Sequence, residues 1–419
     1  MSELKALSSI TSKIGSGLTP RGGNSVYTDS GISLIRSQNV LDMDFSTENL
    51  AYIDEIQAEK LNNVIVEKND ILLNITGDSI ARCTIVPEEI LPARVNQHVS
   101  IIRCKNTEQS KYVMYYLQYI KKYLLQISKV GGTRNALTKE AISKLPIKIS
   151  EDWNRISTIL DNIDRKIKIN NQINQELEAM AKTLYDYWFV QFDFPDQNGK
   201  PYKSSGGKMV YNPELKREIP DGWGVEKLGE LIELERGVTY AKSDIVEKTT
   251  KDAIGVLRAT NITGNVMDLN DLVYLTKDKI NNKQIIKQNE TLIVMSSGSK
   301  EHLGKNAINY YEEVIGFGAF CSKIVPKKYS AFINTFLQSS EFKGYLLKQS
   351  MGTNINNLTN SDILDCRIIL PKEEILDKFE NMVEKNIRLI SNNYIQNKEL
   401  TQLRDWLLPM LMNGQVKVE

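Results

Sequence analysis

The side chains best suited to contact another molecule lie in short polar loops beside glycines. Two examples are Thr76–Arg82 and Gly131–Asn135. These loops carry arginine, asparagine, threonine, serine and lysine, which donate hydrogen bonds to phosphates and to the edges of bases. Backbone amides at the glycines can bind phosphate as well. The loops therefore predict a contact with nucleic acid, although polar loops are also an ordinary feature of protein surfaces.

We assign polar residues from two stretches of the chain to this predicted contact. The first set is Thr19, Arg21, Arg36, Asn39, Thr76, Asp78, Arg82, Asn96, Gln97, His98, Thr133, Arg134 and Asn135. The second set is Thr239, Tyr240, Lys242, Arg258, Asn261, Ser297, Lys300, Thr353, Asn354 and Asn356. Arg36 and Arg258 follow equivalent predicted strands, so a structural role is an equally good interpretation of these two arginines.

Other kinds of chemistry find little support in the sequence. The segment Gly298–Lys305 has one residue too many between its glycines for a P-loop, and Asn306 replaces the required serine or threonine. The two histidines, His98 and His302, occupy different places in the repeat described below, and the carboxylates do not cluster. We therefore predict a protein with no catalytic site and no metal site of its own.

The polar loops belong to a long internal repeat with a period near 222 residues. Gly31–Val40 matches Ala253–Ile262, and Val66–Gly77 matches Ile286–Gly298. Late in each copy, a Gly-Thr pair followed by Leu-Thr and an isoleucine recurs. Two copies of about 150 residues are too long for solenoid repeats, so they predict two domains of one fold.

The copies differ where the loops lie. By the sequence match, Arg94–His98 of the first copy corresponds to Ile315–Ala319 of the second. One scaffold with two different loop sets favours two different recognition targets. The predicted boundaries are 1–150 for the first domain, 151–190 for a long helix, 191–222 for a linker, 223–371 for the second domain, and 372–419 for a second long helix with a tail.

Within each copy, short β-branched runs predict strands, for example Ile32–Ile35, Ile71–Ile75 and Cys321–Val325. Helical periodicity appears at Lys111–Ile127 and Ala331–Lys348. The fold class is therefore α+β with a largely β core.

An apolar stripe with steps of four and three residues follows each copy, which is typical of a seam between paired helices. We expect these residues to form the pairing face: Ile156, Leu160, Ile163, Ile167, Leu177 and Leu184 in the first helix, and Phe379, Val383, Ile390, Leu400 and Leu407 in the second. Antiparallel pairing would give both copies equivalent surroundings. The alternative is that each helix lies on its own domain.

Composition sets broad limits on the interpretation. The chain has 53 Lys and Arg residues against 52 Asp and Glu residues, so charge alone argues neither for nor against nucleic acid. No apolar run is long enough for a membrane span. Four scattered cysteines and an N-terminus unlike a signal peptide predict a cytoplasmic protein without disulfides.

Taken together, the duplicated blocks resemble the specificity subunits of Type I restriction–modification enzymes. The resemblance covers nearly the whole chain and includes Gly17-Leu-Thr-Pro20, Gly237-Val-Thr239 and the helix end Leu184–Phe189. The second copy departs from this pattern at Tyr240, where the first has Pro20.

The resemblance implies two target-recognition domains that read the two halves of a bipartite site in double-stranded DNA. It implies partners, namely two adenine methyltransferase subunits and further motor-nuclease restriction subunits, with the long helices as spacer and docking surface. S-adenosylmethionine, ATP and Mg²⁺ would belong to those partners and not to this chain. Two other functions stay open from the residues alone, a stand-alone DNA-modifying enzyme and a coiled-coil protein scaffold.

Overall fold

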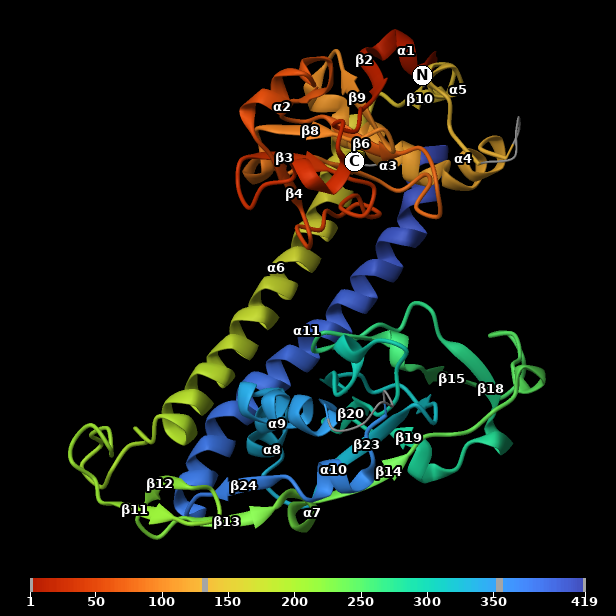
Figure 1. Cartoon of the computed structure of the whole chain (residues 1–419). Helices are drawn as coiled ribbons and strands as arrows, with labels where there is room; N and C mark the ends of the chain where they lie inside the picture. Colours follow the sequence, from red (N-terminus) through yellow and green to blue (C-terminus); the bar gives the residue numbers. More distant parts are fainter. Residues whose placement is uncertain (1–2, 130–134, 352–356, 417–419) are drawn as a thin grey trace. The chain divides into compact units, whose positions relative to one another are not determined.

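The computed structural model describes residues 3–129, 135–351 and 357–416. The chain divides into two compact units, residues 1–168 with 397–419, and residues 169–396 (Figure 1). Each unit contains one repeated domain and part of both long helices. The sequence placed each helix in a segment of its own, whereas the contacts divide both helices between the units.

Two four-stranded sheets form the centre of the first unit. The first sheet is antiparallel, in the order β2 (Thr11–Ser16), β9 (Val99–Cys104), β6 (Ile71–Asn74) and β7 (Cys83–Ile85). The second sheet has the order β4 (Ala51–Ile53), β3 (Ile32–Ile35), β8 (Ala93–Val95) and β5 (Ile65–Val66). Its central pair, β3 and β8, is parallel. Strands β1 (Glu3–Ala6) and β10 (Pro146–Ile149) form a separate antiparallel pair.

Alternation along the shared strands produces two apolar layers in this unit. On β6, Leu72 packs in the core between the sheets, whereas Ile71 and Leu73 pack in the core on the helical side. Successive side chains of a strand point to opposite faces, so one strand serves both cores. The helices are α1 (Leu7–Ile10), α2 (Glu55–Glu59), α3 (Ser110–Tyr119), α4 (Lys121–Ile127) and α5 (Lys139–Ser143).

The second unit repeats this topology strand for strand. Its first sheet has the order β14 (Ile232–Arg236), β23 (Cys321–Pro326), β20 (Thr291–Val294) and β21 (Asn306–Ile308). Its second has β18 (Val273–Thr276), β15 (Ala253–Leu257), β22 (Ile315–Phe317) and β19 (Ile285–Ile286), again with a parallel central pair. Strands β13 (Gly224–Lys227) and β24 (Arg367–Leu370) pair as β1 and β10 do. The predicted duplication is confirmed.

The remaining elements of the second unit refine two predictions. They are strands β16 (Ile262–Thr263) and β17 (Val266–Met267) and helices α7 (Leu228–Leu231), α8 (Ser330–Gln338), α9 (Ser340–Met351) and α10 (Asn360–Leu364). The single helices predicted at 111–127 and 331–348 are each broken. Ser339 has an extended backbone, and its hydroxyl accepts a hydrogen bond from the amide of Phe342, which starts a new helix. Ile120 lies outside the helical region between α3 and α4.

The predicted linker also contains ordered structure. Strands β11 (Met209–Asn212) and β12 (Arg217–Pro220) form an antiparallel hairpin. Phe192 and Phe194 are buried and contact the Trp223 ring, with centroid distances of 5.7 and 4.8 Å. Burial of three aromatic rings fixes this segment against the second unit instead of leaving it as a loose connection.

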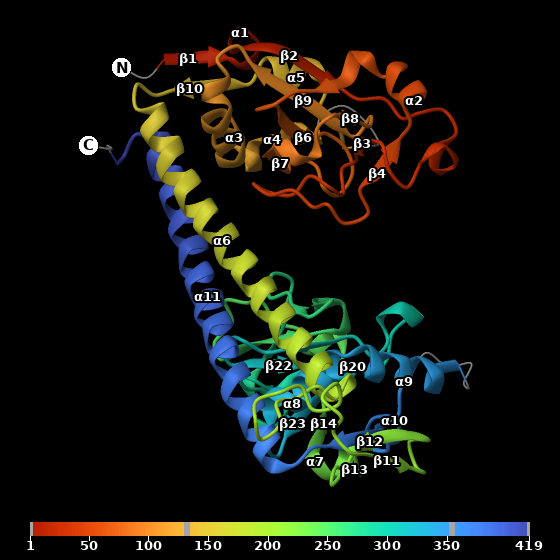
Figure 2. The same cartoon turned by 90° about the vertical axis from the view of Figure 1, so that its left-hand side faces the viewer.

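The long helices are α6 (Trp153–Tyr185), continued by one π-helical turn at Asp186–Val190, and α11 (Glu373–Asn413). They lie side by side in both views (Figures 1 and 2). In the first unit, Asp164 of α6 accepts a 2.8 Å ion pair from Arg404 of α11. Arg404 interrupts the apolar stripe, and its ion pair with the half-buried Asp164 explains why a charge is tolerated there.

In the second unit the same helices pair through asparagines. The Asn393 amide donates to the Asn174 side chain over 2.8 Å, and Asn170 donates to Gln396 over 2.8 Å. From Asn170 to Asn174 the residue numbers on α6 rise, while those of their partners on α11 fall from 396 to 393. The helices therefore run antiparallel, which confirms the prediction. Polar groups inside a seam reduce stability but specify register.

The residues predicted to pair the helices differ in burial. Ile156, Leu160, Ile163, Phe379, Val383 and Ile390 are buried, and Ile167, Leu177, Leu184, Leu400 and Leu407 are half-buried. Within the described residues, no helix has the length and apolarity needed to cross a membrane.

Candidate nucleic-acid interface

In the first domain, three of the predicted loops and the segment just before α5 meet at one edge of the β2–β9–β6–β7 sheet. The amide of Leu18 donates to the carbonyl of Val95, at the end of β8. The amide of Ile75 donates to the His98 carbonyl, and the amide of Leu137 donates to the Ile75 carbonyl. These backbone bonds bring the segments after β2, β6 and β8, and the segment before α5, to one place.

The glycine of the Gly-x-Thr motif permits this convergence. A Cβ atom on Gly17 would lie 1.9 Å from the carbonyl oxygen of Val95. Only a residue without a side chain allows the two backbones to approach so closely. Thr138, from the Leu-Thr block, caps α5 by accepting a hydrogen bond from the amide of Ala141. Both repeated motifs therefore have a local structural cause.

A polar cluster occupies this edge. The hydroxyl of Thr76 lies 2.6 Å from Nδ1 of His98, and the side-chain amide of Gln97 lies 3.0 Å from its Nε2. Gln97 is exposed, and Thr76 and His98 are half-buried. Both ring nitrogens therefore have side-chain neighbours, which orients the imidazole and leaves the outer amide groups of Gln97 toward solvent.

Other predicted residues of the first domain lie around this cluster or at its margin. Thr19, Arg21, Asp78 and Asn135 are exposed, and Arg82 is half-buried. Thr133 and Arg134 lie outside the described residues. Asp78 would repel a phosphate, so a base amino group suits this position better than the DNA backbone.

The second domain builds the same edge with different side chains. The amide of Val238 donates to the Phe317 carbonyl, Met295 donates to Phe320, and Leu358 donates to Met295. A Cβ atom on Gly237 would lie 2.3 Å from the carbonyl oxygen of Gly318. The backbone of the interface is therefore duplicated along with the sheets.

This geometry corrects the sequence match by one residue. Ile35 pairs with Val95 in the first domain, and Leu257 pairs with Phe317 in the second. Segment 94–98 therefore corresponds to 316–320 and not to 315–319. The glycine-rich stretch offered no side-chain pattern to fix the alignment.

The corrected match places Phe320 at the position of His98. Phe320 is 64% exposed, which is unusual for a large apolar side chain. It was not among the predicted site residues, because polar types alone were selected. An aromatic residue within a glycine-rich turn was the available signal, since exposed rings can stack on bases or contact thymine methyl groups.

The remaining predicted residues of the second domain have mixed exposure. Thr239, Lys242 and Lys300 are exposed, and Tyr240 and Ser297 are half-buried. Ser296, beside Ser297, donates to the side chain of Asn357. Thr353, Asn354 and Asn356 lie outside the described residues.

Asn39 and Asn261 are not contact residues, and these two predictions are corrected. Asn39 has no exposed surface; its oxygen accepts from the amide of Arg36, and its amide donates to the carbonyls of Ser46 and Glu48. Asn261 is likewise buried and bonds the loop of the second domain in the same way. All their hydrogen-bonding groups are used in holding the loop closed.

The arginines that precede them support the structural interpretation. Arg36 donates to the Asn49 carbonyl, and Arg258 donates over 2.9 Å to the Asp271 carbonyl and forms an ion pair with its carboxylate at 2.7 Å. Asn96 is also corrected, because it is buried and accepts from the amide of His98. These residues help to position the loops of the interface, and Arg36 and Arg258 also keep part of their surface exposed.

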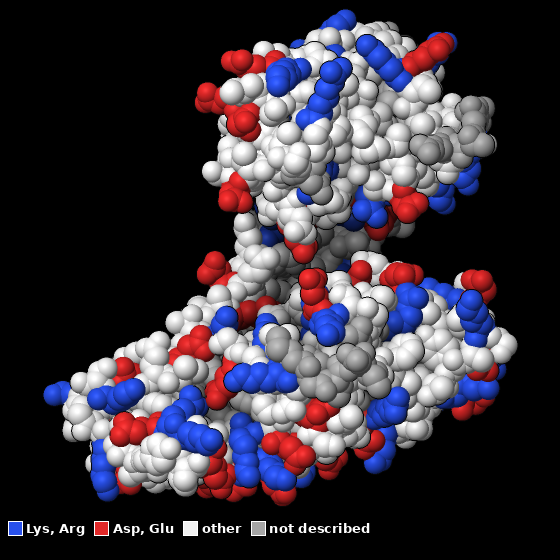
Figure 3. All heavy atoms as spheres, in the orientation of Figure 1, with Lys and Arg blue, Asp and Glu red and all other residues white. Residues whose placement is uncertain are grey.

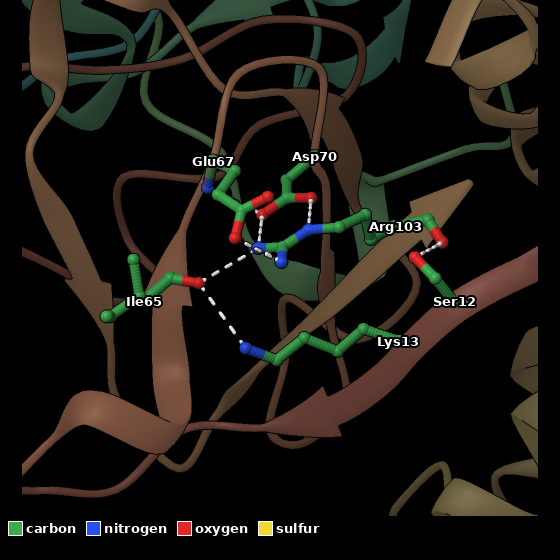
Figure 4. A network of polar contacts seen from close by, with 6 residues as sticks. All are labelled: Ser12, Lys13, Ile65, Glu67, Asp70 and Arg103. Atoms are coloured by element: carbon green, nitrogen blue, oxygen red, sulfur yellow. Dashed lines mark hydrogen bonds and ion pairs between the residues drawn. The ribbon is translucent and has the colours of Figure 1, made fainter. Parts of the chain in front are cut away.

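A cation inside the first domain fixes the strands behind the loops (Figure 4). Arg103 forms an ion pair with the fully buried Asp70 at 2.8 Å and donates to the carbonyl of Ile65 over 3.1 Å. The hydrogen bonds that Arg103 donates to Asp70 raise the pKa of Arg103, whereas burial and the nearby Arg103 lower the pKa of Lys13. The Arg103 guanidinium therefore joins neighbouring strands of the first domain.

The second domain also has a cation behind its loops, but at a different position of the equivalent strand. Lys323 donates to the carbonyl of Ile285 over 2.8 Å and forms an ion pair with Glu290 at 3.1 Å. By the strand pairing, Lys323 corresponds to Ile101 and not to Arg103. The cation has moved two residues along the strand, which keeps it on the same face.

The face shown in Figure 3 carries charges of both signs. Lysine and arginine side chains are interspersed with acidic ones in both units on this face. Residues 3–129, 135–351 and 357–416 contain no cluster of acidic, histidine and cysteine side chains able to hold a metal ion.

Comparison with known proteins gives consistent results. Residues 33–179 and 220–398 match the family described as the Type I restriction modification DNA specificity domain. The chain is 28% identical over 339 residues to the Type I restriction enzyme MjaIX specificity subunit of Methanocaldococcus jannaschii, covering 78% of this chain and 74% of that protein. It is 36% identical over 143 residues to the EcoKI specificity subunit of Escherichia coli, covering 34% of this chain and 31% of that protein.

The fold also has a counterpart among solved structures. The Type I restriction–modification S subunit from M. genitalium superposes with a TM-score of 0.52 and 12% identity, covering 98% of this chain and 96% of that one. At this identity the likeness concerns the fold. The family matches cover the first domain from residue 33 onward, the whole second domain and part of each long helix.

Proposed function

The chain belongs to the Type I restriction modification DNA specificity family, and from this premise we propose that it recognises a bipartite DNA sequence, one part with each domain. The loop edge around Gln97 and His98 would read the first part. The edge around Thr239 and Phe320 would read the second. The chain would act as the specificity subunit that directs adenine methylation and cleavage by partner subunits.

One observation carries this proposal. The two edges share their backbone hydrogen bonds, yet differ in the side chains they present. His98 with Gln97 in one domain is replaced by Phe320 with Ala319 in the other. A scaffold kept constant under a variable surface is what two readers of different sequences require. A scaffold protein without a DNA target would have no use for this pattern.

Partner docking has physical support on the long helices. Besides the buried seam, α6 exposes Ile173 and Met180, seven residues apart, and Tyr187 follows at the same spacing in the π-helical turn. Met382 and Leu389 of α11 are exposed at this spacing too. A second apolar stripe on a helix indicates a further helical partner. We propose that the chain binds two methyltransferase subunits and that these helices are part of the docking surface.

The catalytic groups would lie on those partners. S-adenosylmethionine, ATP and Mg²⁺ would be bound by the methyltransferase and restriction subunits, and the present chain would supply neither nucleophile nor cofactor. We place this activity in the cytoplasm, where the four free cysteines would remain reduced.

The decisive experiment is a domain exchange. Residues 1–150 would be replaced by the corresponding domain of another family member, and the complex with its methyltransferase partner expressed in cells. Sequencing of modified adenines should show one part of the motif replaced and the other part retained. Replacement of both parts, or of neither, would contradict the two-reader proposal.

Two assays on the purified protein, one of the chain alone and one of its complex with the partner, separate the alternative functions. DNA modification or cleavage by the purified chain alone would identify a stand-alone enzyme. Absence of DNA binding even with the partner present would identify a protein scaffold.

A further inference from the structure

The second domain contains a cavity beside its loop edge. The cavity has a volume of about 290 Å³ and lies between the β20–β21 loop and α9. Its floor is apolar: Leu346 and Leu358 are buried, and Leu303 is half-buried. Leu358 also donates its amide to Met295, at the edge described above. The cavity therefore adjoins the proposed interface.

A difference in loop length creates the cavity. Seven residues, 76–82, separate Ile75 from Cys83, whereas ten residues, 296–305, separate the equivalent Met295 and Asn306. In the first domain, Ile80 and Ala81 of the short loop are buried in the helical-side core. In the second, the longer loop passes around Leu346, with the left-handed Gly304 packed against it. The two domains therefore differ in the length and packing of the loop at this position.

The rim of the cavity is basic. Lys300, Lys305 and Lys343 line it, against a single carboxylate, Glu301. None of the three ammonium groups forms an ion pair within the described part of the chain. An apolar floor with a cationic rim complements a group that is apolar in its body and anionic at its edge, as a deoxyribose with its phosphates is.

The position of the cavity helps to select the occupant. Leu358, on the floor of the cavity, donates its amide hydrogen bond to Met295 at the loop edge. DNA held at that edge would pass the basic rim, so the DNA backbone is the occupant that the position and the charge favour.

We infer that this cavity is an additional DNA-backbone site of the second domain, in which the lysines bind phosphates and the leucines contact a deoxyribose. The inference rests on the proposed function and specifies it further. The second domain would hold its part of the site through a backbone contact at this cavity, beside its loop edge. The extra contact would add affinity without selecting a base.

The test uses the full chain assembled with its methyltransferase partner. Lys343→Gln removes a rim charge, and Leu347→Trp places a large ring at the rim, where Leu347 is exposed. Lys227→Gln is the matched control, because Lys227 lies on β13 and pairs with Asp365 outside the cavity. Dissociation constants for a cognate and an unrelated duplex would be measured over a range of salt concentrations.

Loss of one phosphate contact should weaken binding about eight-fold at 0.1 M salt and lower the salt dependence by about 0.9. Lys343→Gln should show this loss on both duplexes, because the contact is not sequence-specific. Leu347→Trp should also weaken binding, and the methylated motif should be unchanged in both variants. Lys227→Gln should bind like the wild type.

Three outcomes would overturn the inference. Wild-type affinity and salt dependence in both rim variants would remove the cavity from the DNA contact while leaving the proposed function intact. Failure of the Leu347→Trp chain to assemble with the methyltransferase would assign the cavity to a protein partner. Absence of DNA binding by the wild-type complex would reject the proposed function, and this inference with it.

Discussion

At equivalent places in the fold, the first domain carries His98 between Thr76 and Gln97, and the second carries Phe320, which is largely exposed. The backbone bonds around both positions are the same, and so are the glycines that allow them. The framework is fixed by main-chain contacts and by buried asparagines, neither of which depends on the outward side chains. The side chains at the loop edge can therefore change without altering the fold.

The largest effect is expected where the framework is tightest. Gly17→Ala forces a methyl group against the Val95 carbonyl and should destabilise the first domain by about 3 kcal/mol, near the upper end for overpacking. Gly15→Ala is the control, because no atom lies within 4 Å of its added Cβ. Urea unfolding of the full chain measures both variants. Equal stability of the two would show that Gly17 does not define the framework.

A smaller loss is expected when a loop asparagine is removed. Asn39→Ala leaves the amide of Arg36 and the carbonyls of Ser46 and Glu48 without their partner, at a cost of about 2 kcal/mol. Gln38→Ala, at an exposed neighbour, should change stability little. The bases read by the second domain should be unaffected. If the Asn39→Ala chain were as stable as the wild type but methylated a different DNA sequence, Asn39 would be a DNA-contact residue.

Exchange of His98 and Phe320 tests whether these side chains, which differ between the two domains, determine the bases that are read. His98→Phe gives the first domain the ring of the second and should change or relax one position of the first half-site, costing about 1–2 kcal/mol in binding. Phe320→His is the reciprocal variant, expected to act on the second half-site alone. Sequencing of methylated adenines measures both. A change in the opposite half-site would break the separation between the domains.

The smallest expected effect concerns Glu178, a carboxyl on the part of α6 that belongs to the second unit. Burial raises the pKa of Glu178 to about 7, in a cavity of about 260 Å³ that is also lined by Lys182, Lys343 and Tyr310. Between pH 4.5 and 7, Glu178 therefore keeps its proton in the folded state, whereas in the unfolded chain it has already lost that proton. Stability should fall as the pH rises from about 4.5 to 7, by on the order of 1 kcal/mol once solvent screening is included.

Glu178→Gln should remove this pH dependence from the second unit, and the exposed Glu176→Gln should leave it in place. Hydrogen exchange of α6 at pH 5 and pH 8 measures the difference. Continued pH dependence in Glu178→Gln would place its origin in another group.

The sequence predicted the repeat, the fold class and the paired helices, because hydrophobic periodicity and matched blocks report on buried faces. It did not separate structural from exposed polar residues. Asn39 and Asn96 have the residue type of a base reader, but burial is a property of the folded chain. The one-residue error at 315–319 has a related cause, since glycines leave no periodic pattern. Phe320 escaped selection because an apolar ring usually indicates a core.

The helical breaks and the hairpin show a second limit. Ile120 and Ser339 interrupt apolar patterns that continue across them, and the break depends on local capping and turn geometry. The hairpin at 209–220 lies in a segment rich in glycine and lysine that resembles a linker in composition. Its order comes from Phe192, Phe194 and Trp223, whose contacts are with residues close in space.

Each domain begins and ends on paired strands, β1 with β10 and β13 with β24. The polypeptide thus enters and leaves each domain at adjacent points, and the ladder between them is made of main-chain bonds that most sequences can form. A genetic crossover at these two strands would transfer a complete reader while keeping both joins intact. New site specificities could then be inherited in single recombination events, without a gradual series of partly folded intermediates.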